Sequence, residues 1–147
     1  MELVSTRVGT PANGDSNEAH IDATGRWVVF QSNANNLVPG DTNKWTDVFL
    51  HDRQTGTTEL VSVGLKGAAA NGRSYARGVS ADGRYVAFSS AAENLVPGDT
   101  NKAGDVFVRD MQAGVTERGS VGPGGEQGNK ESADCAISTD GRFVADD

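Results

Sequence analysis

The stretch Asn36-Leu37-Val38-Pro39-Gly40-Asp41-Thr42-Asn43-Lys44 occurs twice in this chain, because the same residues return unchanged from Asn94 to Lys102. The two copies lie 58 residues apart, and the same interval carries Gly25-Arg26 onto Gly83-Arg84 and Gly141-Arg142. Repetition at such an interval is typical of propellers, solenoids and other arrays of one supersecondary unit. The 147 residues therefore hold about two and a half copies of a repeat rather than one ordinary domain.

Each repeat contains four short stretches rich in β-branched and aromatic residues, separated by turns rich in Gly, Asp and Asn. In the second copy these stretches cover about 74–80, 84–90, 105–110 and 116–121. No part of the chain has a sustained helical period. Four strands joined by tight turns and repeated head to tail predict the blade of a β-propeller. We therefore expect an all-β fold of four-stranded antiparallel blades.

The repeat interval predicts a single partial β-propeller over residues 1–147. We expect the last strand of one blade at 2–8, full blades at 13–64 and 71–122, and the first two strands of a further blade at 129–147. These strands cannot close a ring, since propellers usually have four to eight blades. Two copies could close a six-bladed ring if each N-terminal strand joined the C-terminal strands of the other chain.

A homodimer with half a ring per chain is therefore expected, because closed two-fold assemblies are the commonest oligomers. The alternative is an inert fragment of a larger propeller, whose open edges would recruit other chains or aggregate.

One segment of the repeat resembles a known family. The sequence Ser80-Ala81-Asp82-Gly83-Arg84-Tyr85-Val86-Ala87-Phe88-Ser89-Ser90, followed by 105–110, is similar to the WD40-like repeat of bacterial TolB-like β-propellers. It is matched at 22–32 with 47–52, and again at 138–145. The resemblance covers almost the whole chain and implies a propeller fold. It implies no single activity, because such propellers serve as protein-binding scaffolds, as entrance domains of peptidases and as enzymes.

The charge of the chain argues against a nucleic-acid partner, and its hydropathy argues against a membrane span. Thirteen Lys and Arg against twenty Asp and Glu give a net charge of −7, which does not fit the basic surface of a nucleic-acid binder. No apolar run reaches the roughly 18 residues of a membrane span. The N-terminus carries no signal-peptide pattern, so the sequence leaves the location undetermined. Relatives of the repeat are mostly periplasmic or extracellular, which the resemblance implies for this chain.

Oxygen-bearing side chains recur at matching positions of the two long loops, in the pattern Asp-x-Asn-x-x-x-Asp. The two sets are Asp41, Asn43 and Asp47, and Asp99, Asn101 and Asp105. Calcium takes six to eight oxygen ligands, so each set is a candidate calcium site. The pattern lacks the final Glu of an EF-hand loop. The alternative is an Asx-type turn, in which these side chains bond the local backbone.

A second candidate site lies on the first strand of each blade, which lines the channel of a propeller. Here the repeat varies: the polar residues are Glu18, His20 and Asp22 in the first copy, Arg77 and Ser80 in the second, and Asp134 and Ser138 in the third. In a closed ring, these acidic residues could hold a central calcium that polarises a carbonyl or activates a water. By analogy with six-bladed calcium-dependent hydrolases, the reaction would be opening of a lactone or an ester. The alternative is that these residues are merely solvated.

Three further patterns predict structural roles. Trp27, Tyr85 and Phe143 occupy one repeat position and are expected between blades. His51 is replaced by Arg109 in the second copy and is therefore expected to face solvent. Each repeat also carries an Arg beside its first turn, which we expect to pair with an aspartate of that turn, as Arg84 with Asp82.

The sequence thus leaves three functions open. The first is a ring-forming propeller that binds calcium and a small-molecule or protein ligand through its loops or its channel. The second is a calcium-dependent hydrolase of small lactones, such as acyl-lactones, or of esters. The third is an inert fragment of a larger propeller.

Overall fold

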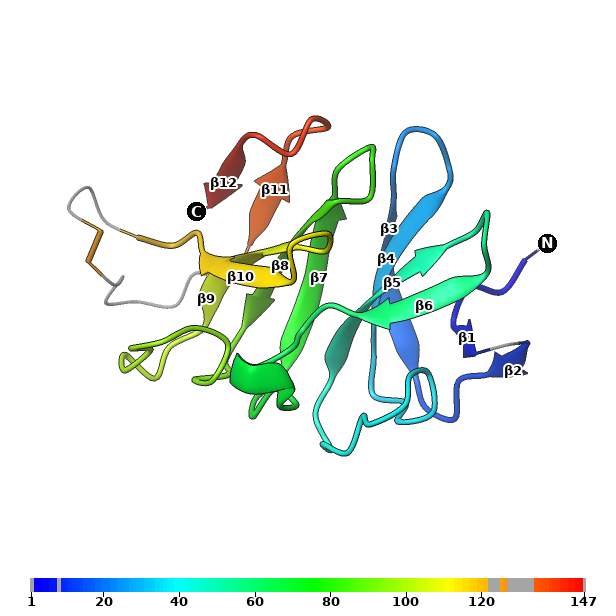
Figure 1. Cartoon of the computed structure of the whole chain (residues 1–147), viewed down its shortest axis with the longest axis horizontal. Coiled ribbons are helices and arrows are strands. Elements are labelled where there is room, and N and C mark those ends of the chain that lie inside the picture. Colours follow the sequence, from blue (N-terminus) through cyan, green and yellow to red (C-terminus); the bar gives the residue numbers. More distant parts are fainter. Residues whose placement is uncertain (1, 8, 122–124, 127–133, 147) are drawn as a thin grey trace.

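The computed structural model describes residues 2–7, 9–121, 125–126 and 134–146. It contains two four-stranded antiparallel sheets flanked by two smaller strand pairs (Figure 1). The expected all-β fold with four-stranded antiparallel sheets is therefore confirmed. Within the described residues, helical structure is limited to the short 3-10 turn η1 (Leu65–Gly67), and no helix is long and apolar enough to cross a membrane.

Each four-stranded sheet is a meander in which consecutive strands pair. The first sheet comprises β3 (Ser16–Ile21), β4 (Trp27–Ser32), β5 (Asp47–Asp52) and β6 (Thr57–Leu60). The second sheet comprises β7 (Ser74–Val79), β8 (Tyr85–Ser90), β9 (Asp105–Asp110) and β10 (Val115–Arg118). The third sheet is the pair β11 (Cys135–Ile137) and β12 (Val144–Asp146). Residues 129–133, expected at the start of this last unit, lie outside the described residues.

The N-terminal segment differs from the expected strand at 2–8. Among the described residues of this range, 2–7, the strand is limited to β1 (Thr6–Arg7), which pairs with β2 (Thr10–Pro11). The pair Thr6↔Pro11 corresponds to the bridge Val63↔Ala69 in the connection between the two large sheets. A strand needs a hydrogen-bonded neighbour, and the described part of this chain places no third strand of that blade beside the segment.

The sheets pack face to face in chain order. β7 lies against β3, β4 and β5 of the first sheet, and β11 lies against β7 and β8 of the second (Figure 1). The largest core lies between the first two sheets, where Val29 and Leu50 meet Phe88 and Phe107. Burying these side chains stabilises the fold by about 2 kcal/mol each. Each sheet thus supplies half of the core that covers its neighbour.

The repeated loop is anchored in these cores. Leu37 and Val38 of the first copy, and Leu95 and Val96 of the second, are buried. The Asn that precedes each pair bridges two segments. Asn94 accepts a hydrogen bond from the backbone N–H of Asn71 at 3.1 Å, and its amide group donates to the carbonyl of Ala69 at 2.8 Å. The repeat therefore conserves Asn-Leu-Val because the loop closes the end of the sheet.

His51 is buried rather than solvent-facing, so that prediction is wrong. Its side chain is 3% exposed, and its Nδ1 lies 2.9 Å from the hydroxyl of Thr58. The same hydroxyl donates to the carbonyl of Thr6 at 3.0 Å. The N-terminal segment therefore lies over this part of the first sheet, which the repeat pattern alone did not show. Burial lowers the pKa of His51.

The recurring arginines pair with a different aspartate from the one expected. Arg26 binds Asp52 at the end of β5 through two hydrogen bonds of 2.9 and 2.7 Å, and Arg84 binds Asp110 in the same way in the second sheet. The turn residue Asp82 instead accepts hydrogen bonds from the Ser80 hydroxyl and from the backbone N–H of Arg84. The prediction missed this because the true partner lies on the neighbouring strand in space but 26 residues away in sequence.

An aromatic ring at the start of the second strand of one sheet packs on a glycine of the following sheet, in the turn between that sheet's first two strands. Trp27 is partly buried, and an added Cβ at Gly83 would overlap its ring. Tyr85 lies over Gly141, where an added Cβ would lie 2.5 Å from the ring. The expected position between sheets is therefore confirmed for Trp27 and Tyr85. Phe143 is 65% exposed instead, because no further sheet follows β12 in the described chain.

Gly83→Ala should test this contact by destabilising the fold. Its φ of +71° costs a side chain about 1 kcal/mol, and overlap with Trp27 adds about 1–3 kcal/mol. Gly40→Ala is the matched control, because Gly40 has a φ of +82° and open space around it. Chemical denaturation of both variants should show the larger loss for Gly83→Ala. Equal losses would mean that the ring contact adds nothing.

Candidate functional site

Two of the predicted channel residues lie around one arginine. Arg77 on β7 has its Nη1 3.3 Å from Glu18 of the first sheet and its Nε 3.5 Å from Asp134, which precedes β11. The guanidinium is largely buried, whereas both carboxylates are exposed. Glu18 sits at a β-bulge, with a φ of 47°. The structure therefore brings Glu18 and Asp134 together as partners of a cation.

The other two channel candidates are placed differently. His20 lies on β3, where all residues are exposed. Asp22 is buried in the turn after β3, and its carboxylate accepts hydrogen bonds from the backbone N–H groups of Thr24 and Trp27. Those backbone and hydroxyl donors lower the pKa of Asp22 against the opposing effect of burial. Asp22 thus acts in the turn and not beside Glu18.

The second repeat builds the same turn, but the aspartate and the hydroxyl residue exchange places: Asp22 and Thr24 in the first copy correspond to Ser80 and Asp82 in the second. In the first sheet Asp22 accepts from Trp27 N–H at 2.7 Å, and in the second the hydroxyl of Ser80 accepts from Tyr85 N–H at 3.0 Å. In both turns this residue is hydrogen-bonded to the one two positions later, Asp22 to the Thr24 hydroxyl and the Ser80 hydroxyl to Asp82. The variation at this repeat position therefore has a local structural cause.

The first long loop forms an Asx-type turn around its predicted metal ligands. The amide nitrogen of Asn43 donates to Asp47 at 2.7 Å, and its amide oxygen accepts from the backbone N–H of Trp45 at 2.8 Å. Asp47 is fully buried and also accepts a 2.6 Å hydrogen bond from Ser62. Asp41 is half-buried nearby, and its charge raises the pKa of Asp47.

The second loop repeats this geometry and adds an internal cation. Asn101 donates to Asp105 at 3.0 Å, as Asn43 does to Asp47. Arg118 then lies between two carboxylates, with its Nη2 3.2 Å from Asp99 and its Nε 3.7 Å from Asp105. All three side chains are buried. The first loop has no such cation, because the residue that corresponds to Arg118 is Leu60.

These contacts bear on whether calcium fits the two loops. Each Asn amide is engaged at both ends, so its oxygen is not open to a metal. Calcium needs six to eight oxygens, and each loop offers two carboxylates. Within the described residues, no three or more His, Cys, Asp or Glu side chains are grouped as a metal site requires. The side chains present do not form a ready calcium cage, and calcium stays a prediction.

Burial makes Asp47 the most strongly perturbed acid of the loops. Desolvation raises its pKa from 3.8 to about 6, although Ser62 and Asn43 oppose the shift. A folded-state pKa above the unfolded value means that the folded protein holds the proton more tightly. Stability from this group is therefore greatest below about pH 4 and is lost as the pH rises through about 6.

Asp47→Asn should remove this pH dependence. The stability of the wild type relative to the variant should fall by up to roughly 3 kcal/mol between about pH 4 and about pH 7, as a shift of about two units requires. Urea denaturation across this range measures the difference. Any lost hydrogen bond in the variant costs the same at each pH, so only the change with pH is diagnostic.

Asp110→Asn is the control for this experiment. The hydrogen bond from Arg84 lowers the pKa of Asp110 to about 2, so its contribution is already complete above about pH 4. This variant should keep the wild-type pH dependence between about pH 4 and about pH 7. A wild-type slope in Asp47→Asn would contradict the raised pKa.

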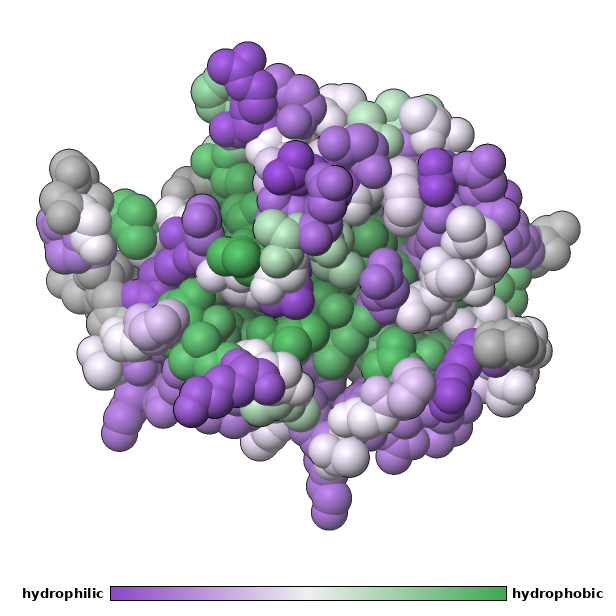
Figure 2. Space-filling model, in the orientation of Figure 1, coloured by the Kyte–Doolittle hydropathy of each residue, from purple (hydrophilic) through white to green (hydrophobic). Residues whose placement is uncertain are grey.

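A cavity that the sequence did not predict lies beside the second sheet. It has a volume of about 530 Å³ and is lined by η1, by Leu95 and Pro97 of the long loop, and by Arg109 and Val115. Figure 2 shows hydrophobic residues gathered on this face of the molecule. Arg109 donates to Thr116 at 3.0 Å, while its buried Nε has no hydrogen-bond partner. The only signal in the sequence was the exchange of His51 for Arg109.

The first strand of the first sheet, β3, is open. All residues of β3 are exposed, whereas the corresponding strand β7 alternates between buried and half-buried residues. The side chain of Ile21 is 60% exposed, while its counterpart Val79 packs against the core. The difference arises because the first sheet covers β7, and the described residues include no preceding sheet over β3.

Comparison with known proteins supports the fold. No protein-family model matches the sequence, and no curated protein sequence matches it. The structure is similar to that of TolB from Acinetobacter baumannii, with a TM-score of 0.51 and 15% identity. The match covers 93% of this chain and 27% of the TolB chain. At this identity the likeness shows the fold alone, so the chain has a TolB-like propeller fold at a coarse level.

Proposed function

We propose that this chain is a ring-forming propeller module whose first function is self-association. Two copies close one ring of six blades, and the closed ring presents its long loops and channel to a ligand or partner. The observation that carries the proposal is the open face of β3. A strand that is exposed along its whole length, in a repeat whose other copy is covered, is incomplete without another sheet.

The N-terminal segment supports this arrangement. Glu2 binds Arg53 of the first sheet, with Oε2 2.7 Å from Nη2. At the corresponding position of the next interface, Glu59 of β6 and Met111 line one pocket. The N-terminal segment therefore lies over the first sheet as β6 lies over the second. In the proposed ring this segment is the last strand of a composite blade, and the strands of the other chain pair beside it.

The mass in solution tests the proposal. Light scattering on the purified chain should give about 31 kDa, which is twice 15.3 kDa. Burial of two symmetry-related interfaces should make the dimer persist on dilution to micromolar concentration. A monodisperse species of about 15 kDa would contradict the proposal. Aggregates of undefined size would also contradict it and would favour the inert fragment.

Calcium binding is a second candidate, favoured only by the contrast between the two loops. Arg118 already lies between Asp99 and Asp105, whereas Asp41 and Asp47 have no equivalent cation. If a calcium ion binds, it binds the first loop. Millimolar Ca²⁺ should then raise the melting temperature relative to chelator, because a ligand of the folded state stabilises it. Asp41→Ala should remove the increase and Asp99→Ala should keep it.

Lactone or ester hydrolysis stays a prediction that the same preparations can test. Turnover of an acyl-lactone that disappears with chelator, and that is lost in Glu18→Ala and Asp134→Ala, would support a channel metal. Arg77 already pairs with both residues, so a metal there would have to displace its guanidinium. An unchanged melting temperature together with no turnover would contradict both candidates.

A further inference from the structure

We infer that Phe143 of one copy packs on Gly25 of a second copy, and that this contact closes the ring. The inference rests on the proposed function and names the residues that form the joint. It follows from a contact that the chain makes twice within itself.

The two internal examples share three layers. Trp27 lies over the backbone of Gly83 in the next sheet, and Tyr85 lies over Gly141 in the one after. An arginine guanidinium also lies over each ring, with Arg26 4.5 Å from the ring centroid of Trp27 and Arg84 4.9 Å from that of Tyr85. Each ring thus contacts both an arginine of its own sheet and a glycine of the following one.

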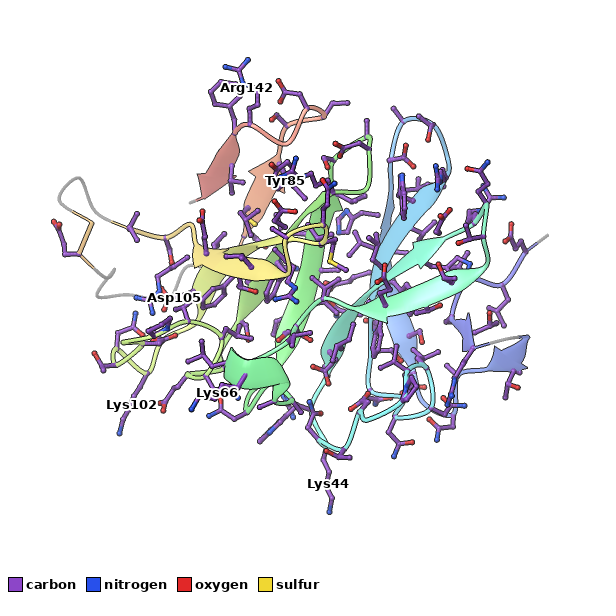
Figure 3. All side chains as sticks on the ribbon, viewed as in Figure 1. Lys44, Lys66, Tyr85, Lys102, Asp105 and Arg142 are labelled. Carbon is purple, nitrogen blue, oxygen red and sulfur yellow. The ribbon has the colours of Figure 1, made fainter. Side chains whose placement is uncertain are left out.

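Phe143, the third aromatic of the series, also has an arginine over its ring. The guanidinium of Arg142 lies 5.5 Å from the ring centroid of Phe143, so two of the three layers are present. The ring itself is 65% exposed. Figure 3 shows Arg142 at the outer end of the third sheet, projecting away from the rest of the molecule. An exposed Phe already stacked on an arginine lacks only the glycine layer.

Gly25, the first glycine of the series, has no aromatic ring packed on it among the described residues. Gly25 has a φ of +76°, close to the +71° of Gly83 and the +72° of Gly141. Among the described residues, an added Cβ at Gly25 would meet only Arg53 Nη1 at 3.6 Å and Ile21 Cδ1 at 4.0 Å. Its turn therefore has the same backbone as the two occupied turns, with space where their aromatic rings lie.

A second copy is the occupant that these observations favour. Phe143 requires a first turn with glycine in the left-handed conformation, and the turn at Gly25 is such a turn with no aromatic ring on it among the described residues. Each copy offers one open ring and one open glycine, so a two-fold dimer satisfies both at once. The fit needs no new geometry, because it repeats the interface between the first and second sheets.

Dimer affinity in matched variants tests the contact. Phe143→Ala removes the ring, and Gly25→Ala places a Cβ where the ring would lie. Each should raise the dimer dissociation constant at least tenfold, as expected for a buried aromatic anchor. Phe143→Tyr restores the residue type of Tyr85 and should dimerise as the wild type does. Gly40→Ala carries the same backbone strain as Gly25→Ala in open space and should also dimerise normally.

Mixing the two disrupted variants separates a lost contact from a lost fold. In a mixed dimer, Phe143 of the Gly25→Ala chain meets the intact Gly25 of the Phe143→Ala chain, so one contact of the two is regained. The mixture should therefore dimerise more tightly than either variant alone, as measured by sedimentation. Variants that fail to fold would not complement each other, and far-ultraviolet circular dichroism should show wild-type β content in each.

The outcomes distinguish the contact from the proposed function. A wild-type dimer that persists unchanged in Phe143→Ala and Gly25→Ala would overturn the contact while leaving self-association intact. A monomeric wild type would overturn self-association and the contact with it. Weakened dimers that regain affinity on mixing would support both.

Discussion

The packing of an aromatic ring on a glycine of the following sheet is the constraint on which the rest of the structure depends. Each four-stranded sheet has two apolar faces, and neither can stay in water without loss of stability. The ring sets how closely the next sheet approaches, because only a residue without a Cβ leaves room beneath it. The shared core of Val29, Leu50, Phe88 and Phe107 lies between the same two sheets.

The need to cover the end of each sheet explains why the long loop is repeated so faithfully. The loop must close the end of each sheet with buried Leu and Val, and must then return the chain to a buried strand. Its Asn and Asp side chains satisfy the backbone and one another during that return. Where the repeats differ, as at Leu60 and Arg118, the local charge balance differs as well. Figure 3 shows Lys44 and Lys102 projecting from the two loops, while Asp105 lies at the start of β9.

For much of the candidate site, the sequence predicted the repeat position of a residue but not the residues that it contacts. The interval placed Glu18 and Asp134 at the same position of their repeats, at or beside the first strand, yet it did not show that an arginine lies between them. Arg77 stands at a repeat position that Ala19 and Cys135 occupy in the other copies, so the variation marked it as a polar residue of this strand but not as the partner of two carboxylates. The pairing of Arg84 with Asp110 was missed for a similar reason, because partners across a meander are separated by a whole loop.

The sequence by itself determined the all-β class, the four-stranded unit and the position of Trp27 and Tyr85 between sheets. It could do so because hydrophobic alternation and turn residues act locally, and because a repeat shows each local pattern more than once. Only the tertiary structure decided that His51 is buried, that the N-terminal segment forms a hairpin, and that β3 and Phe143 are left open. Burial depends on which segment covers a face, and that is a property of the assembled sheets rather than of any one strand.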